Sequence, residues 1–133
     1  MRDAIYDASF CAALIFTEAH SEKAKHLLGI YRNGHAPVLW HYEISHILVK
    51  RVNDGVFAQA DIAHGQHFFT ALDIAFHENE DICTLTDIAL TYNLSGYDAA
   101  YLHLAKRMHL PLLTFDKKLA EAAKKAGLPP IDV

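Results

Sequence analysis

The sequence predicts an α/β protein, a three-layer α/β/α sandwich around a short, mainly parallel sheet of four to five strands. Two observations lead to this fold class. Short apolar segments suited to buried strands alternate along the chain with longer segments of helical composition. In addition, 52% of the 133 residues are hydrophobic and 21% are charged, which indicates a globular core rather than disorder. We therefore expect one domain over residues 1–133.

The chain is expected to begin with a strand and two helices. Residues 4–6 form a short apolar strand. Ser9 is a candidate N-cap for an apolar helix over residues 10–16. Ser21 begins a second helix with apolar residues at helical spacing, and Asn33-Gly34 is expected to end it.

A second strand and more helix follow. Residues 37–39 are predicted to be a buried strand. The helix after it carries Glu43 in its first turn and ends at the turn signal of residues 53–55. Residues 58–72 form another helical stretch. Alternating residues 73–77 predict a third strand.

The last part of the chain continues the alternation. Residues 82–92 are helical, and Asn93 is suited to a left-handed helix end. The next helix begins near Ser95 and is followed by the buried strand Leu112-Leu113. Another helix begins after Asp116, and residues 128–131 form a short last strand or an extended tail.

Charge and cysteine content exclude several classes of protein. Twelve Lys and Arg residues against sixteen Asp and Glu give a net charge of −4, so the chain does not hold nucleic acid by overall charge. Cys11 and Cys83 form neither a metal motif nor a disulfide framework, and both are expected to be buried thiols. The apolar run at residues 10–16 is too short to span a bilayer. We expect a cytoplasmic protein without membrane contact.

Four acidic residues are expected at one edge of the sheet. Asp7 and Asp116 follow predicted strands, while Glu43 and Asp98 lie in the first turns of helices. In an open parallel sheet the carboxyl ends of the strands form the edge where ligands bind. Singly, each acid is explained as a helix cap, a turn residue or a complement to a helix dipole, and Ser95 with Asp98 fits a capping box.

The four acids together need a different explanation. Two carboxylates about 4 Å apart repel by roughly 4 kcal/mol at an effective dielectric constant near 20. Hard divalent cations such as Mg²⁺ or Mn²⁺ relieve this repulsion when carboxylates and phosphates bind them. Such ions activate water and stabilise in-line attack on a phosphodiester.

With these motifs in place, the chain resembles the PIN-domain ribonucleases, and more narrowly the VapC toxins of bacterial and archaeal toxin–antitoxin modules. The Tyr-Asp-Ala-Ala-Tyr and Thr-Phe-Asp sequences are the specific parts of the match, which covers essentially the whole chain in order. The matching segments are residues 6–9 with Glu18 downstream, residues 36–44 with 53–55, residues 94–105 and residues 111–119.

The resemblance implies the PIN fold and a divalent-metal-dependent endoribonuclease, the toxin of a type II toxin–antitoxin system. It also implies a homodimer and a VapB-like antitoxin as partner. The implied ligands of Mg²⁺ or Mn²⁺ are four catalytic acids, and Thr114 would orient a carboxylate or water. These acids are Asp7, Glu43, Asp98 and Asp116.

Two departures from the family pattern lie beside these motifs. Lys117 and Lys118 stand where some relatives carry a further acid, and because they flank Asp116 they are candidates for contacts with RNA phosphates. Gly96 stands where many relatives have a larger residue.

Other functions remain as alternatives. A stand-alone PIN-domain RNA-processing nuclease is the runner-up, followed by a catalytically silent domain that binds a partner. A receiver domain is disfavoured because residues 76–78 supply no aspartate after the third strand, and Asp7-Ala8-Ser9 lacks the Asp-x-Asp pattern of phosphoaspartate phosphatases. The pair His64 and His67 is more simply explained as solvated imidazoles than as a zinc site.

Overall fold

A four-stranded parallel sheet with strand order β3-β2-β1-β4 lies at the centre of the computed structural model, which describes residues 2–16, 19–78 and 81–131. Glu18, part of the first matching segment, lies outside the described residues. The strands are β1 (Asp3–Tyr6), β2 (Asn33–Pro37), β3 (Ile74–His77) and β4 (Leu112–Leu113).

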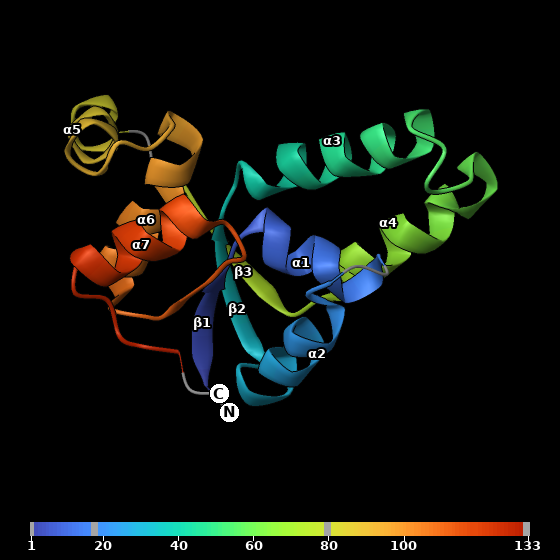
Figure 1. Cartoon of the computed structure of the whole chain (residues 1–133), viewed down its shortest axis with the longest axis horizontal. Helices are drawn as coiled ribbons and strands as arrows, with labels where there is room; N and C mark the ends of the chain where they lie inside the picture. The colour runs from blue at the N-terminus through green and yellow to red at the C-terminus, as the bar shows by residue number, and fades with distance from the viewer. Residues whose placement is uncertain (1, 17–18, 79–80, 132–133) are drawn as a thin grey trace.

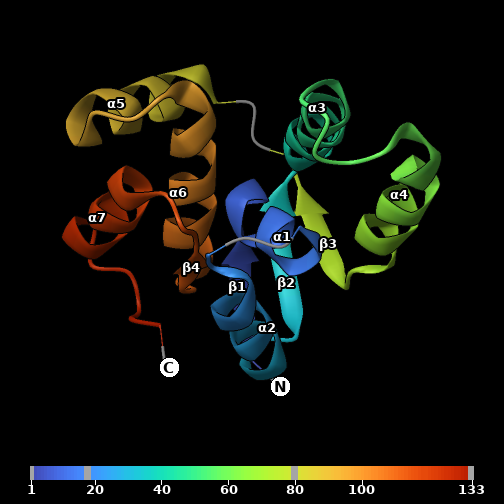
Figure 2. The same cartoon turned by 45° about the vertical axis from the view of Figure 1, so that its right-hand side comes forward.

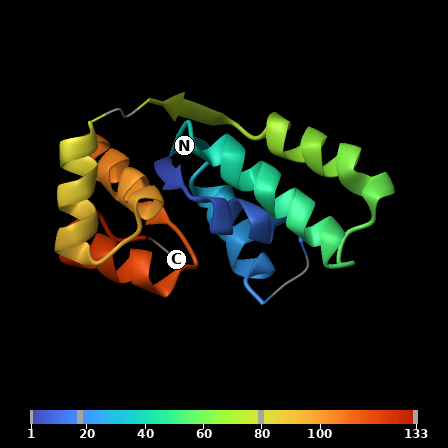
Figure 3. The ribbon, with the colours of Figure 1, turned by 90° about the horizontal axis from the view of Figure 1, so that it is seen from above.

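Helices flank the sheet in two groups, one on each side (Figures 1 and 2). In the first group, α1 packs against α2, α3 and α4; in the second, α6 packs against α5, α7 and three of the strands. Figure 3 shows the two groups from above. The predicted α/β/α fold class is therefore confirmed. The helices are α1 (Ala8–Ile15), α2 (Ser21–Ile30), α3 (Trp40–Asn53), the short 3₁₀ helix η1 (Gln59–Asp61), α4 (Ile62–Ala71), α5 (Ile82–Tyr92), α6 (Gly96–Met108) and α7 (Lys117–Lys125).

The second strand begins earlier than the sequence predicted. Asn33-Gly34 does not end α2, which ends at Ile30; it begins β2, and Val38 and Leu39 form the turn into α3. The ring of Tyr6 explains the glycine, because a Cβ atom on Gly34 would lie 2.4 Å from that ring. Gly34 pairs with Ala4, and with no side chain at position 34 the Tyr6 ring can lie over the strand without either one shifting.

The start of α1 also differs from the prediction. Asp7, not Ser9, is the N-cap, and its Oδ1 accepts a hydrogen bond from the backbone N–H of Phe10 at 2.8 Å. Both residues are good N-caps by type, and the pairing of β1 with β4 decides between them because it keeps residues up to Tyr6 in the strand.

Three smaller predictions have mixed outcomes. Asn93 adopts the left-handed conformation at the end of α5, with φ of 53°, as predicted. Residues 128–131 do not form a strand and have no regular secondary structure, so the described sheet has four strands. Cys11 is buried as expected, but Cys83 is exposed at the first turn of α5, so the prediction that it is buried is wrong.

The core joins β1 to the helices that pack on either side of it. Its fully buried side chains include those of Tyr6, Phe10 and Tyr101, from β1, α1 and α6. Among the residues that the structure describes, Asp7 is the only buried one with an ionisable acidic or basic side chain of the Asp, Glu, Lys or Arg type, and 5% of its surface is exposed. In the described part of the chain, no helix combines the length and apolar character that crossing a bilayer requires.

Candidate active site

The four predicted acids all belong to the edge at which the parallel strands end. Asp7 follows β1 directly, and Asp116 follows β4 after two residues. Glu43 lies in the first turn of α3, the helix entered from β2, and Asp98 lies in the first turn of α6. Neighbouring acids along this edge affect each other's ionisation. The charge of Glu43 raises the pKa of Asp7, the charge of Asp98 raises that of Glu43, and the charge of Asp116 raises that of Asp98.

Asp7 is the buried member of the group. Its Oδ1 accepts hydrogen bonds from the N–H of Phe10 and from the hydroxyl of Ser9, both at 2.8 Å, and its Oδ2 accepts one from the hydroxyl of Thr114. Burial raises the pKa of the Asp7 carboxyl from 3.8 to about 6; the hydrogen bonds oppose this increase and the charge of Glu43 adds to it. Asp7 therefore exchanges its proton close to neutral pH.

Two hydroxyl groups connect Asp7 to the loop after β4. Ser9 Oγ accepts a hydrogen bond from the N–H of Phe115 at 3.1 Å, and Thr114 Oγ1 accepts one from the N–H of Asp116 at 3.0 Å. Since both hydroxyls also donate to Asp7, they hold the two strand ends together. Sequence reasoning selected Thr114 but missed Ser9 in this role; its position two residues after Asp7 was the available signal.

Asp116 and Asp98 both lie at helix N-termini. Asp116 is the N-cap of α7, and its Oδ1 accepts a hydrogen bond from the N–H of Leu119 at 3.1 Å. Ser95 is the N-cap of α6 and accepts from the N–H of Asp98. Partial burial raises the pKa of Asp98, and the charge of Asp116 raises it further.

Glu43 is held from the opposite group of helices. The hydroxyl of Tyr101, on α6, donates a hydrogen bond of 2.6 Å to Glu43 Oε1. Burial raises the pKa of Glu43; the Tyr101 bond lowers it, and the charge of Asp98 raises it. Tyr101 was absent from the predicted site residues, although it lies three positions after Asp98 on the same helix.

The two lysines differ in their surroundings. The ammonium group of Lys118 lies close enough to Asp98 to lower the pKa of that carboxyl. Lys117 is exposed in the first turn of α7.

The donor set fits a hard divalent cation by type but is not preassembled. All four groups are carboxylates, which suit Mg²⁺ or Mn²⁺. Three of them have raised pKa values, chiefly because they are buried and further because of the neighbouring acid's charge. Within residues 2–16, 19–78 and 81–131, however, no three His, Cys, Asp or Glu side chains are grouped so that they could hold a metal ion.

Comparison with known protein families identifies the domain to which these four acids belong. The family described as the PIN domain matches residues 4–125. The chain belongs to the PIN-domain family.

Individual relatives agree with this assignment. The PIN domain described here is 31% identical over 121 residues to a protein of Pyrobaculum aerophilum named Ribonuclease VapC3, a match that covers 88% of this chain and 92% of that protein. The crystal structure of PAE2754 from Pyrobaculum aerophilum superimposes with a TM-score of 0.72 at 23% identity, covering 92% of this chain and 81% of that one. The second likeness concerns the fold.

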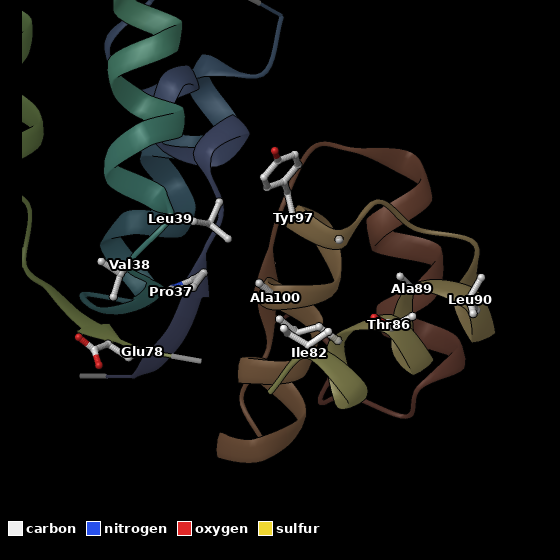
Figure 4. A pocket seen from close by; sticks show the side chains of 12 residues that line it. Pro37, Val38, Leu39, Glu78, Ile82, Thr86, Ala89, Leu90, Tyr97 and Ala100 are labelled. Atoms are coloured by element: carbon white, nitrogen blue, oxygen red, sulfur yellow. The ribbon is translucent and has the colours of Figure 1, made fainter. Parts of the chain in front are cut away.

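An apolar groove of about 860 Å³ lies beside the acidic edge of this PIN domain. It separates the turn after β2, with Val38 and Leu39, from α5 and the start of α6, as Figure 4 shows. Tyr97, the neighbour of Asp98, projects toward the Leu39 side of the groove (Figure 4). A second groove of about 540 Å³ is lined by Glu43 and Tyr97. The acids therefore border apolar surface.

Proposed function

We propose that this PIN domain is a divalent-metal-dependent endoribonuclease and the toxin component of a type II toxin–antitoxin system. The proposal rests on a series of four carboxylates in which the charge of one raises the pKa of its neighbour. Asp7, a member of this series, is buried although it can carry a charge. Such an arrangement is costly unless a cation neutralises it. The relative named Ribonuclease VapC3 supports the choice of RNA as substrate.

Asp7, Glu43, Asp98 and Asp116 would hold Mg²⁺ or Mn²⁺. When bound, the ion would lower the pKa of a water molecule and offset the negative charge of the phosphate. The fit lies in the donor type, because oxygen ligands are those that these ions prefer. Thr114 would keep the Asp7 carboxylate in a fixed orientation through its hydrogen bond to Oδ2.

The reaction proposed is hydrolysis of an RNA phosphodiester. The water oxygen bonds to phosphorus while the bond from phosphorus to the leaving sugar oxygen breaks. One of the four carboxylates accepts the proton of the water, and the leaving oxygen takes a proton from solvent. Lys117 and Lys118 would contact neighbouring phosphates, so replacing them would weaken binding of all RNA sequences about equally.

The proposed partners follow from the VapC-like relative. We expect RNA as substrate, a VapB-like antitoxin as protein partner, a homodimer as the assembly, and the cytoplasm as the location. A small reading frame immediately upstream that encodes a DNA-binding antitoxin would favour the toxin role over a stand-alone RNA-processing nuclease.

A second candidate function is a catalytically silent PIN domain that binds a partner. The observation that favours it is that the described His, Cys, Asp and Glu side chains include no group of three able to hold a metal ion. The apolar groove beside the acids would then serve protein binding alone.

The deciding experiment is cleavage of a mixed pool of structured RNAs by the purified protein. Mn²⁺ or Mg²⁺ should support cutting, and EDTA should stop it. Asp98→Asn should slow cutting by about 100-fold or more, since even the outer partners of metal ligands are worth about 10–100-fold. The matched control is Asp87→Asn, which changes an exposed carboxylate on α5.

Two results would overturn the nuclease proposal. If the Asp98→Asn variant cleaved RNA as fast as the wild type with the same ion, the four acids could not be the catalytic residues. No cleavage of any RNA, together with no thermal shift on adding Mn²⁺, would favour the silent partner-binding domain.

A further inference from the structure

We infer that Tyr101 is a positioning residue of the proposed metal centre: its buried hydroxyl fixes one oxygen of Glu43 and leaves the other for a cation. The inference rests on the proposed function. It goes further by assigning a role to a residue that is neither acidic nor expected to touch metal or RNA.

The hydrogen bond joins the two groups of helices at the acidic edge. Tyr101 is only 1% exposed, on α6, and its hydroxyl donates to Glu43 Oε1 on α3 over 2.6 Å. Leu39, the N-cap of α3, makes no capping hydrogen bond through its side chain. In the same turn Trp40 bonds to Cys11 Sγ and the ring of His41 to the Val38 carbonyl, and neither of these contacts holds the Glu43 carboxylate. The orientation of Glu43 therefore depends on α6.

Helix α6 controls two of the four acids in this arrangement. Asp98 and Tyr101 are three residues apart, so they lie on the same face of the helix. The helix presents the Asp98 carboxylate directly and holds the Glu43 carboxylate through Tyr101. A shift of α6 would move both acids together.

The direction of the hydrogen bond gives it an electrostatic effect. Burial and the charge of Glu43 raise the pKa of the Tyr101 phenol, so the phenol stays protonated and acts as the donor. A donor to the ionised carboxylate lowers the pKa of Glu43, against burial and Asp98, which raise it. Removing the hydroxyl would leave Glu43 Oε1 without this donor, so the carboxylate would no longer be held in one orientation for a metal ion.

A purely structural role makes a different prediction, and Tyr6 supplies the matched comparison. Tyr6 is also fully buried, and its hydroxyl donates to the backbone carbonyl of Tyr31, which belongs to the end of α2. Tyr6→Phe and Tyr101→Phe each delete the hydrogen-bonding hydroxyl of a buried tyrosine. Only Tyr101→Phe removes a contact with one of the four acids.

The experiment measures Mn²⁺ affinity and the Mn²⁺ dependence of RNA cleavage for the wild type and both phenylalanine variants of the full chain. We expect Tyr101→Phe to weaken Mn²⁺ binding by about 10–100-fold, as is usual when the partner of a metal ligand is lost. The Mn²⁺ concentration that supports half-maximal cleavage should rise by a similar factor, and saturating Mn²⁺ should restore most of the rate. Tyr6→Phe should match the wild type in both measurements.

A double-mutant cycle tests whether Tyr101 acts through Glu43. In the Glu43→Gln background, Tyr101→Phe should cause little further loss of Mn²⁺ affinity, because the acid it positions is already gone. A full additional loss in that background would overturn the inference.

The other outcomes separate the inference from the function on which it rests. Wild-type protein that binds Mn²⁺ and cleaves RNA, with Tyr101→Phe indistinguishable from Tyr6→Phe, would overturn the role of Tyr101 alone. Wild-type protein that neither binds Mn²⁺ nor cleaves RNA would overturn the proposed function, and the role of Tyr101 with it.

Discussion

Thr114 donates a hydrogen bond to Oδ2 of Asp7, which joins the ends of two adjacent strands whose residues are 107 positions apart in the sequence. The backbone supports this contact, since the N–H of Asp7 donates to the carbonyl of Leu113 at 3.2 Å. The register of β1 with β4, which pairs Tyr6 with Leu113, brings the two side chains together. The Thr114 hydroxyl therefore has two effects: it holds the ends of β1 and β4 together, and it lowers the pKa of the buried Asp7 carboxyl.

Thr114→Val tests that link. The Thr114 bond lowers the pKa of Asp7, so the variant should raise this pKa above about 6 and leave the ionised carboxylate without one donor. We expect a loss of about 1–3 kcal/mol in the free energy of unfolding at pH 8, with a smaller loss at pH 5, where Asp7 is protonated. Urea unfolding at both pH values without divalent ions measures it.

The control for Thr114→Val is Thr70→Val. Thr70 donates to the Gln66 carbonyl within α4 at an exposed position, so its hydrogen-bond partner is not a carboxylate. Its effect on unfolding should not depend on pH. An equal loss at pH 5 and pH 8 for Thr114→Val would contradict the proposed link to Asp7.

Substitutions of Asp116 should separate its capping role from its proposed metal role. Asp116→Ala removes the oxygen that accepts from the N–H of Leu119, and we expect about 0.5–2 kcal/mol of lost stability. Asp116→Asn keeps an oxygen for the cap and should be nearly as stable as the wild type. Both variants should lose Mn²⁺-dependent cleavage. If the asparagine variant cleaved normally, Asp116 would be a cap and no ligand.

The stabilising effect of Mn²⁺ should increase with pH. Raised pKa values mean that the folded protein holds protons on Asp7, Glu43 and Asp98 more tightly than the unfolded chain does. Without metal, Asp7 stabilises the fold as the pH falls from about 6 toward 4, and this contribution is lost as the pH rises. Glu43 and Asp98 act in the same direction. Metal binding requires the deprotonated acids, so the increase in Tm caused by Mn²⁺ should be larger at pH 7.5 than at pH 5.

Differential scanning fluorimetry at the two pH values measures this increase. Asp98→Asn serves as the comparison and should show a smaller Mn²⁺ effect at pH 7.5. A Tm increase that is independent of pH in the wild type would mean that the ion binds elsewhere.

Gly34→Ala should destabilise the sheet because of the Tyr6 ring. The added Cβ would lie 2.4 Å from an aromatic carbon, so the ring or β2 must move. We expect a cost of about 1–3 kcal/mol in chemical unfolding, as is common for overpacked cores. Gly29→Ala in α2 is the control, since a Cβ there meets no atom within 4 Å and should stabilise the helix by about 0.5–1 kcal/mol. Equal stability of the two variants would contradict this account of β2.

Local signals predicted most elements correctly, and the errors occur where distant residues decide. Asn93 and Ser95 end and begin helices by short-range hydrogen bonds, so the sequence nearby contains the information. The bounds of β2 depend on its pairing with β1 and on the Tyr6 ring over Gly34. No window around Asn33-Gly34 contains Tyr6, and the pair therefore looked like a helix end.

For the candidate site, the order of strands and helices was enough to predict the edge of the sheet at which the acids lie. Parallel strands bring their carboxyl ends to one edge, so the placement of Asp7 and Asp116 follows from the order of the elements. The contact of Ser9 with Phe115 and that of Tyr101 with Glu43 were not predictable, because the partners lie 106 and 58 positions apart in the sequence. Which polar side chain meets which acid depends on how the two groups of helices pack.

The direction of the strands also decides where the protein can be attached to a surface or fused to another protein. The start of β1 and the segment that follows α7 both lie at the lower end of the molecule in Figures 1 and 2, although they are not side by side. Strand β1 runs from Asp3 at this side toward Asp7 at the acidic edge. An affinity tag, a fluorophore or a sensor chip attached through either end would therefore leave the acids facing away from the attachment point and open to RNA.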